Sequence, residues 1–312
     1  MISDKKLQKL VNLIHTEGME NAGKIWGASP QSMKRYRHLA IERGIDPTTT
    51  WGKAPKVLVF DIETLPMEVY SWRIGNKLSI NHDNIIKEWS ILSWSAKWFM
   101  EPEIMSDCVN SEEAINRNDT RVCQSLWELF NEADVLIGHN GRNFDVRKMN
   151  ARFIYHEMLP PSPYEVIDTY KDITRVASFT SFKQDYLTKF FQLEEKLETS
   201  FDLWRRCSIG EQEALDEMLE YNKHDVIGLE ELYITLRPWM TRHPSLNLYY
   251  PDTDGKRCQR CTSTDIELMQ DDYYSTPAGL YKTYRCNCCG GIGRTGKNQV
   301  KKSSGKLRTP AR

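Results

Sequence analysis

The stretch VLVFDIETLP, residues 57–66, decides how this chain is interpreted. Four apolar residues lead into Asp61, and Glu63 follows two positions later, before Pro66 ends the run. Side chains alternate between the two faces of a strand, so both acids point to the same side. Neighbouring carboxylates on a buried strand repel each other unless cations bind between them. Divalent cations with oxygen ligands are the natural partners, and two solvated acids at a strand end are the alternative.

Two further segments place acids beside apolar structure. In VLIGHNGRNFDVRKMNAR, residues 135–152, Asp145 follows a strand and a turn and begins a helix, with Asn140 before the turn. In EYNKHDVIGL, residues 220–229, Tyr221 and Asp225 lie four residues apart, which places them on one face of a helix. Each motif is weak by itself, whereas three acidic segments in this order favour a shared metal site.

Together these motifs resemble those of the DEDD superfamily of 3′–5′ exonucleases, over residues 56–232. FDIET is similar to the first motif of that superfamily, HNGRNFD to the second and YNKHD to the third. The Tyr-x-x-x-Asp form of the third motif is that of the DEDDy branch; the sibling branch has a histidine where this chain has Glu220. The second motif is especially similar to that of proofreading domains in family-B DNA polymerases.

The resemblance implies an α/β domain with a ribonuclease-H-like fold, in which helices flank a mixed sheet. It also implies two divalent ions, Mg²⁺ or Mn²⁺, held by four acids. These are Asp61, Glu63, Asp145 and Asp225. Tyr221 would orient the attacking water, and Asn140 would lie beside the substrate strand. A core aromatic between helix and sheet is the alternative interpretation of Tyr221.

Hydrophobic periodicity predicts alternating strands and helices through the centre of the chain. The predicted strands are 56–65, 68–75, 90–99 and 134–140. The predicted helices are 119–133, 143–158, 181–193 and 211–240. This alternation indicates a mixed sheet covered by helices.

Five of the eight cysteines lie near the C-terminus. CQRC supplies Cys258 and Cys261, and CNCCG supplies Cys286, Cys288 and Cys289. Two Cys-x-x-Cys pairs at this separation predict a four-thiolate structural zinc site. The expected ligands are Cys258, Cys261, Cys286 and Cys289, although Cys288 offers an additional thiol that could replace a neighbour. The region resembles a zinc ribbon with a hairpin between its two knuckles.

The first 46 residues predict three helices in a helix-turn-helix-like arrangement. The first places Leu7, Leu10, Val11 and Ile14 on one face. Ser29 is the expected N-cap of the third helix. Three cations on that helix are candidate DNA contacts, with a solvated helix face as the alternative. These are Lys34, Arg35 and Arg37.

The net charge of −1 hides a partition along the chain. Residues 1–50 carry eight basic and five acidic residues, and residues 256–312 carry twelve and four. The centre is strongly acidic, so the pattern favours a cation-binding site flanked by segments that hold a polyanion. We therefore expect five regions: a helix-turn-helix-like domain at 1–46, a linker at 47–55, an exonuclease domain at 56–245, a zinc ribbon at 246–293 and a basic disordered tail at 294–312.

These observations predict a metal-dependent 3′–5′ exonuclease acting on DNA. An RNA-directed or structure-specific nuclease of the same fold is one alternative, and a DNA-binding regulator with a vestigial nuclease core is another. A replication or repair protein is a possible partner. The sequence has no secretory signal and no apolar run long enough to span a bilayer, so we expect a cytoplasmic protein. The compact combination of regions suggests a phage or mobile-element origin, with the host cytoplasm as the location.

Overall fold

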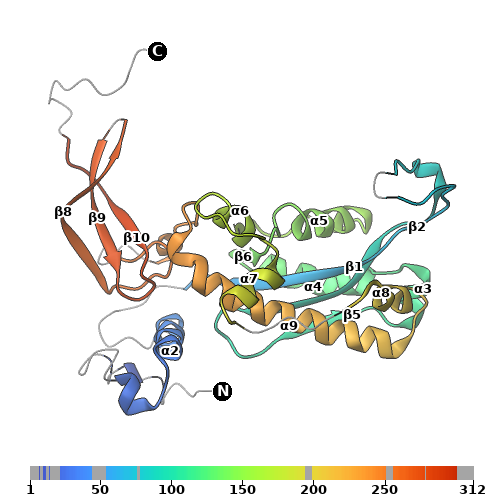
Figure 1. Cartoon of the computed structure of the whole chain (residues 1–312), viewed down its shortest axis with the longest axis horizontal. Helices are drawn as coiled ribbons and strands as arrows, with labels where there is room; N and C mark the ends of the chain where they lie inside the picture. The colour runs from blue at the N-terminus through green and yellow to red at the C-terminus, as the bar shows by residue number, and fades with distance from the viewer. Residues whose placement is uncertain are drawn as a thin grey trace. The chain divides into compact units, whose positions relative to one another are not determined.

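A computed structural model describes most of the chain (Figure 1). It covers Leu7, Leu10, Val11, Ile14 and residues 22–43, 54–75, 78–193, 199–250, 256–277 and 279–300, apart from six side chains within 30–42. Two compact units are present: Lys56–Tyr233, and a second built from Met1–Pro55 with Ile234–Arg312. Each unit is described by itself. None of the helices in the described part of the chain is long and apolar enough to cross a membrane.

The unit Lys56–Tyr233 is built on a five-stranded mixed sheet with the order β5-β4-β1-β6-β7. Its strands are β1 (Val57–Leu65), β4 (Ser90–Trp98), β5 (Met105–Cys108), β6 (Val135–Gly138) and β7 (Glu165–Asp168). β1 pairs antiparallel with β4 and parallel with β6. The strand that carries Asp61 and Glu63 is therefore the central strand of the sheet.

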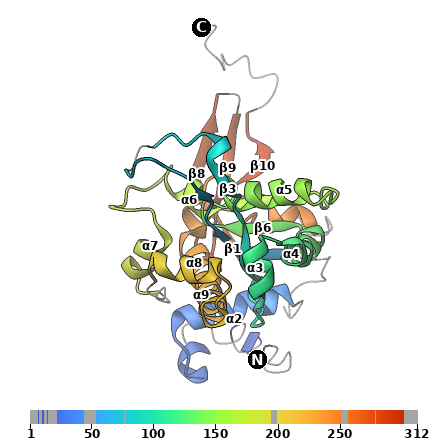
Figure 2. The same cartoon turned by 90° about the vertical axis from the view of Figure 1, so that its right-hand side faces the viewer.

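Helices cover both faces of this sheet. They are α3 (Ser111–Asn116), α4 (Thr120–Glu132), α5 (Asp145–Tyr155), α6 (Thr169–Ile173), α7 (Gln184–Phe190), α8 (Phe201–Ser208) and α9 (Gln212–Leu236). α4 and α5 lie on one side of the sheet, and α8 and α9 lie on the other (Figure 2). The predicted fold class, a ribonuclease-H-like mixed sheet flanked by helices, is confirmed for this unit.

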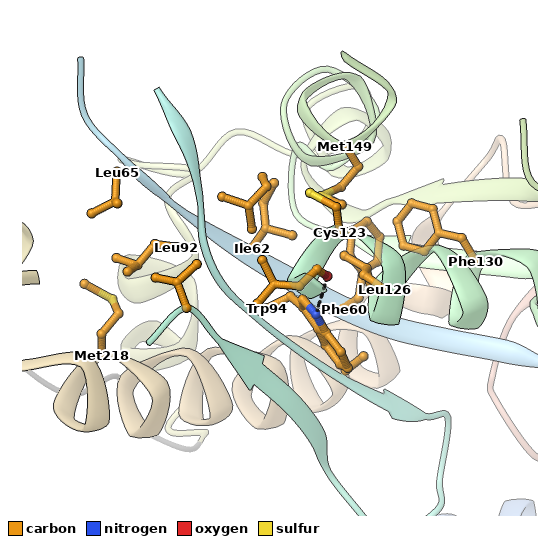
Figure 3. Packing of buried hydrophobic residues seen from close by; sticks show 14 of the residues in the cluster. Phe60, Ile62, Leu65, Leu92, Trp94, Cys123, Leu126, Phe130, Met149 and Met218 are labelled. Carbon is orange, nitrogen blue, oxygen red and sulfur yellow. Dashed lines mark hydrogen bonds between the residues drawn. The ribbon is translucent and has the colours of Figure 1, made fainter. Parts of the chain in front are cut away.

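The two faces of the central strand differ in character. Phe60 and Ile62 point toward α4 and α5, where Phe60 packs edge-on against Phe130 with ring centroids 4.9 Å apart (Figure 3). The Trp94 indole of β4 donates to the Val122 carbonyl of α4 at 2.9 Å. Asp61 and Glu63 alternate with these residues and point to the opposite face, as expected for a strand. The apolar face therefore fixes the strand that carries the acids.

The face toward α9 is polar although it is buried. Lys97 of β4 donates to Glu230 Oε2 of α9 at 2.5 Å, and the Met100 amide donates to Glu230 Oε1 at 2.6 Å. Both charged side chains are almost fully buried. A buried charge is tolerated only when it is paired and hydrogen-bonded. This pair therefore fixes the position of α9 against the sheet.

A second buried ionic network lies on the side of α4 and α5. Asp119, which has no exposed surface, accepts hydrogen bonds from Arg152 Nε at 2.7 Å and Nη2 at 2.5 Å. It also accepts from the Ile91 amide at 2.7 Å and lies 2.6 Å from His156 Nε2. Arg152 is therefore a structural ion-pairing residue on this side of the sheet.

An arm, residues 66–88, interrupts the sheet between β1 and β4. It contains β2 (Glu68–Val69), a 3-10 turn (His82–Asn84) and β3 (Ile85–Lys87), with β2 and β3 antiparallel. The predicted strand 68–75 is wrong beyond Val69. Ser71 Oγ donates to the Arg73 carbonyl at 2.6 Å and accepts from the Arg73 amide at 3.3 Å, so a local turn replaces strand pairing.

The second unit contains a three-stranded antiparallel sheet in the order β10-β9-β8. Its strands are β8 (Ile266–Thr276), β9 (Gly279–Cys286) and β10 (Ile292–Asn298). The predicted hairpin is present as β8 and β9. The expected disordered tail from 294 is corrected, because 294–298 belong to β10: Arg294 packs over the Tyr281 ring at 4.1 Å, and Asn298 Oδ1 accepts from the Leu280 amide at 3.1 Å. Residues 301–312 lie outside the described part.

The predicted helix 211–240 also ends early. α9 stops at Leu236, and Arg237–Trp239 form a 3-10 turn, followed by another at Leu246–Tyr249. Pro238 explains the break, because a proline disfavours α-helical geometry at the residue before it. The last residues of the predicted helix are therefore a turn.

Part of the predicted N-terminal helical domain is described. α2 (Pro30–Glu42) begins as expected, with Ser29 Oγ accepting from the Ser32 amide at 3.1 Å. The four apolar residues placed on one face of the first helix, Leu7, Leu10, Val11 and Ile14, are helical and buried. Leu10 and Ile14 pack in one cluster with Ala22 and Met33. The helix-turn-helix assignment itself stays a prediction.

Candidate metal and nuclease site

Three predicted acids come together on the polar face of the sheet. Asp61 and Glu63 of β1 and Asp225 of α9 each offer a carboxylate oxygen, and these oxygens lie within 4.8 Å of one another. Asp225 comes from a helix more than 160 residues later in the chain. Such a group of hard oxygen donors fits a divalent cation. The β1–β4 register shifts directly after Glu63, and bulges of this kind often lie beside active sites.

Asp145 lies next to this group without being one of its three members. It is the first residue of α5, and its Oδ1 accepts from the Ile62 amide, between Asp61 and Glu63, at 3.4 Å. Burial raises the pKa of Asp145 to about 7, the two backbone hydrogen bonds oppose the rise, and the nearby Asp168 adds to it. The fourth predicted acid is thus buried beside the other three, in a region rich in negative charge.

Asn222 is a site residue that the sequence interpretation missed. Its Nδ2 donates to Asp61 Oδ2 at 2.7 Å, and its Oδ1 accepts from Ser93 Oγ of β4 at 3.4 Å. The side chain is completely buried. Its position within YNKHD, between Tyr221 and Asp225, is the only signal in the sequence. Asn222 orients one carboxylate oxygen of Asp61.

The HNGRNFD loop is organised by Asp168, also missed by the sequence interpretation. Asp168 Oδ1 accepts from the Asn140 amide at 3.1 Å, and Oδ2 accepts from the Arg142 amide at 3.2 Å. Asn140 adopts a left-handed backbone with φ 62°, a conformation that asparagine tolerates better than most residues. A Cβ on Gly141 would lie 2.9 Å from Gly138 Cα, so this turn requires glycine. The loop holds Asn140 half-buried just before Asp145.

Tyr221 lies one helical turn before Asp225, as predicted. Its ring is buried in the hydrophobic core, with the Trp204 ring of α8 edge-on at 6.1 Å. The core position agrees with the alternative interpretation of a packing aromatic. Glu220, which stands where the sibling branch has histidine, is exposed and pairs with Lys223 at 2.6 Å.

The other predicted nucleic-acid contacts lie outside this unit, on α2. Arg35 is exposed. Lys34 and Arg37 are helical, but their side chains lie outside the described residues. The structure therefore leaves these three contacts as predictions.

The four predicted cysteine ligands also meet. Sulfur atoms of Cys258, Cys261, Cys286 and Cys289 lie within 4.8 Å of one another, with Cys261 and Cys286 only 3.5 Å apart. Cys288 is buried but is not in this group. Hydrogen bonds from the neighbouring thiols, led by Cys258, lower the pKa of Cys289. Four converging thiols have the donor chemistry of a structural metal site.

One comparison with known protein families supports the fold. A family model described as RNase_H superfamily matches residues 103–237. This region contains Asp145, Tyr221 and Asp225, and it begins after β1. It indicates a nuclease-type domain with a ribonuclease-H-like fold. No curated protein matches the chain significantly.

One similar solved structure is the family B DNA polymerase from the hyperthermophilic archaeon Pyrobaculum calidifontis. The identity is 14% and the TM-score 0.43, and the match covers 59% of this chain and 25% of that chain. This chain therefore corresponds to only a quarter of that polymerase. The functional argument rests on the acidic site itself.

Proposed function

We propose that this protein is a metal-dependent 3′–5′ exonuclease that hydrolyses phosphodiester bonds at DNA 3′ ends. The convergence of Asp61, Glu63 and Asp225, with Asp145 buried against the same strand, carries the proposal. The carboxylates of this group repel one another unless cations bind between them. Their chemistry fits the binding of divalent cations, and the resemblance of the three motifs supports the exonuclease assignment.

The residues of the chain have separable tasks in this proposal. Asp61, Glu63, Asp145 and Asp225 would hold two Mg²⁺ or Mn²⁺ ions. The ions would supply Lewis-acid stabilisation of the scissile phosphate and of the leaving 3′ oxygen. Asn222 holds the Asp61 carboxylate through its 2.7 Å hydrogen bond. Asn140 would position the terminal nucleotide from the loop before Asp145.

Tyr221 would orient the attacking water. Because that hydrogen bond strengthens only as the water attacks, Tyr221→Phe is expected to lower kcat about tenfold or more with little change in KM. Steady-state kinetics on a single-stranded substrate, with a melting curve as the folding control, measures this. An unchanged kcat would leave Tyr221 as a core aromatic only.

A digestion series tests the proposed function. Single-stranded DNA, duplex DNA and RNA, each labelled at the 3′ end, are incubated with the protein and Mg²⁺ or Mn²⁺. Early release of labelled mononucleotide supports the proposal. Internal fragments would favour the structure-specific nuclease, and preferential digestion of RNA would favour the RNA-directed enzyme. Intact nucleic acid under all conditions would favour a DNA-binding regulator with a vestigial core, in which the exposed Arg35 and its neighbours on α2 contact the duplex.

The cysteine group is proposed to bind one structural zinc ion. Cys261→Ser is expected to remove zinc, since the buried Cys261 sulfur is one of the four converging donors. Elemental analysis should give about one zinc per chain for the unmodified protein and a value near zero for the variant. Cys288→Ser is the matched control, because Cys288 is buried nearby but lies outside the four-sulfur group. A zinc-free unmodified protein would contradict the assignment.

A further inference from the structure

The arm, residues 66–88, begins three residues after Glu63 and exposes large apolar side chains. Trp72 and Ile74 are fully exposed, and Tyr70 is 74% exposed. Exposed apolar groups clustered on one short segment usually mark a binding surface. The arm continues beyond the end of β1, the strand that carries Asp61 and Glu63 (Figure 1).

Ion pairs and hydrogen bonds anchor the base of the arm, although the apolar side chains farther along it are exposed. Glu68 accepts from Arg117 at 2.9 Å and pairs with Lys87 at 3.3 Å. The Tyr70 amide donates to the Asn84 carbonyl at 2.9 Å, beyond the β2–β3 pairing. The backbone next to Trp72 is ordered by the Ser71 turn. The aromatic rings are therefore presented from a fixed backbone.

A strip of alternating rings and cation joins the site to the arm. Phe144 directly precedes Asp145 and is 42% exposed. Lys148, one turn later on α5, lies 5.7 Å from the Phe144 ring centroid and 3.5 Å from that of Trp89. Trp89 follows β3, where the arm returns to the sheet. Phe144, Lys148 and Trp89, called the strip below, thus run from Asp145 to the base of the arm.

We propose that the strip and the arm form a track for a single-stranded segment of nucleic acid, extending the candidate active site by several nucleotides. The inference rests on the proposed function for the direction of the track, since the strip begins at Asp145. The exposed rings of Phe144 and of the arm can stack on unpaired bases of any sequence, and Lys148, which lies over Trp89, can attract the backbone. Duplex bases are covered by their neighbours and cannot stack in this way.

The charges along the track favour a polyanion. Arg73 lies beside Trp72 at the exposed part of the arm, and Lys148 lies within the strip. Of the nearby acids, Glu68 and Asp83 pair with Lys87 and His82, and Glu88 lies close to Lys148. Binding of a protein partner would explain the exposed apolar side chains of the arm. It would not explain why the strip begins next to Asp145.

The test uses binding, so that it does not depend on cleavage. Asp61→Asn serves as the parent chain, and fluorescence anisotropy measures its affinity for single strands of about 4 and about 15 nucleotides. Adding Tyr70→Ala and Trp72→Ala is expected to weaken binding of the longer strand about tenfold or more and to change the shorter one little. Lys148→Met should weaken both. Phe201→Ala, which removes an exposed aromatic ring from α8, is the matched control.

Three outcomes would overturn the track. Equal weakening for a duplex of the same length would mean that the two rings do not stack specifically on unpaired bases. Unchanged affinity for the longer strand would mean that the arm does not touch nucleic acid. Unchanged affinity could also be accompanied by self-association of the parent chain that the Tyr70→Ala and Trp72→Ala variant lacks. In that case the arm binds a second copy of the chain. Absence of cleavage in the digestion series, combined with the expected loss of binding, would reject the exonuclease while leaving the track.

Discussion

Asp61→Asn is expected to lower the rate of phosphodiester hydrolysis by on the order of 10³-fold, because metal stabilisation of the transition state is worth several kcal/mol. Asp61 is one of three acids whose oxygens lie within 4.8 Å of one another, and Asn222 holds its Oδ2 at 2.7 Å. The amide keeps the shape of the side chain but removes a charge. Release of labelled nucleotide from single-stranded DNA, at saturating Mg²⁺, measures the loss.

The controls separate metal binding from folding. Glu220→Gln removes a carboxylate from the same helix as Asp225, but this carboxylate is exposed and pairs only at the surface with Lys223. It should retain near-normal activity. The Asp61→Asn protein should still bind DNA and melt at a similar temperature. Retained cleavage in Asp61→Asn, or an equal loss in Glu220→Gln, would remove the metal-ligand assignment.

Asp119→Ala is expected to destabilise the unit Lys56–Tyr233 by about 3–5 kcal/mol, because it leaves the charge of Arg152 buried without its partner. Asp119 has no exposed surface and accepts from two Arg152 nitrogens and from the Ile91 amide. The loss corresponds to a fall in melting temperature of roughly 10 °C for a domain of this size. Thermal and urea unfolding measure it.

Asp202→Asn is the matched control for this prediction. Asp202 pairs with Arg205 at 3.0 Å, but both side chains are more than half exposed. Exposed pairs contribute about 1 kcal/mol or less, so this variant should unfold close to the unmodified protein. Comparable losses in the two variants would show that the buried position of Asp119 has no special importance.

Much of the candidate site could be predicted from the sequence, because short-range patterns determine which of its side chains share a face. Alternation along β1 put Asp61 and Glu63 on one face, and the spacing in α9 put Tyr221 and Asp225 one turn apart. Asn222 and Asp168 escaped prediction for a different reason. Their roles consist of hydrogen bonds to residues 161 and 28 positions away in the sequence. The partner of such a long-range hydrogen bond cannot be predicted from the asparagine or aspartate alone.

The arm shows where pattern reasoning failed for the fold. Tyr70, Trp72 and Ile74 have strong strand preference, but that preference describes packing on a half-buried sheet. No described strand covers these residues, and Trp72 and Ile74 are fully exposed. The short strands β5 and β7 were not predicted either, because four residues carry too little periodicity to be recognised.

The buried pair of Lys97 and Glu230 links catalysis to the assembly of the unit. Glu230 lies five residues after Asp225 on α9, about 7.5 Å along the helix axis. The pair thus sets the register of α9 on the sheet, and with it the height of Asp225 above Asp61 and Glu63. Replacing both charges by apolar side chains would also leave the buried Met100 amide without its Glu230 acceptor. The change is therefore expected to lower stability and to allow the helix to slide. Heat resistance and turnover would then fall together in this protein.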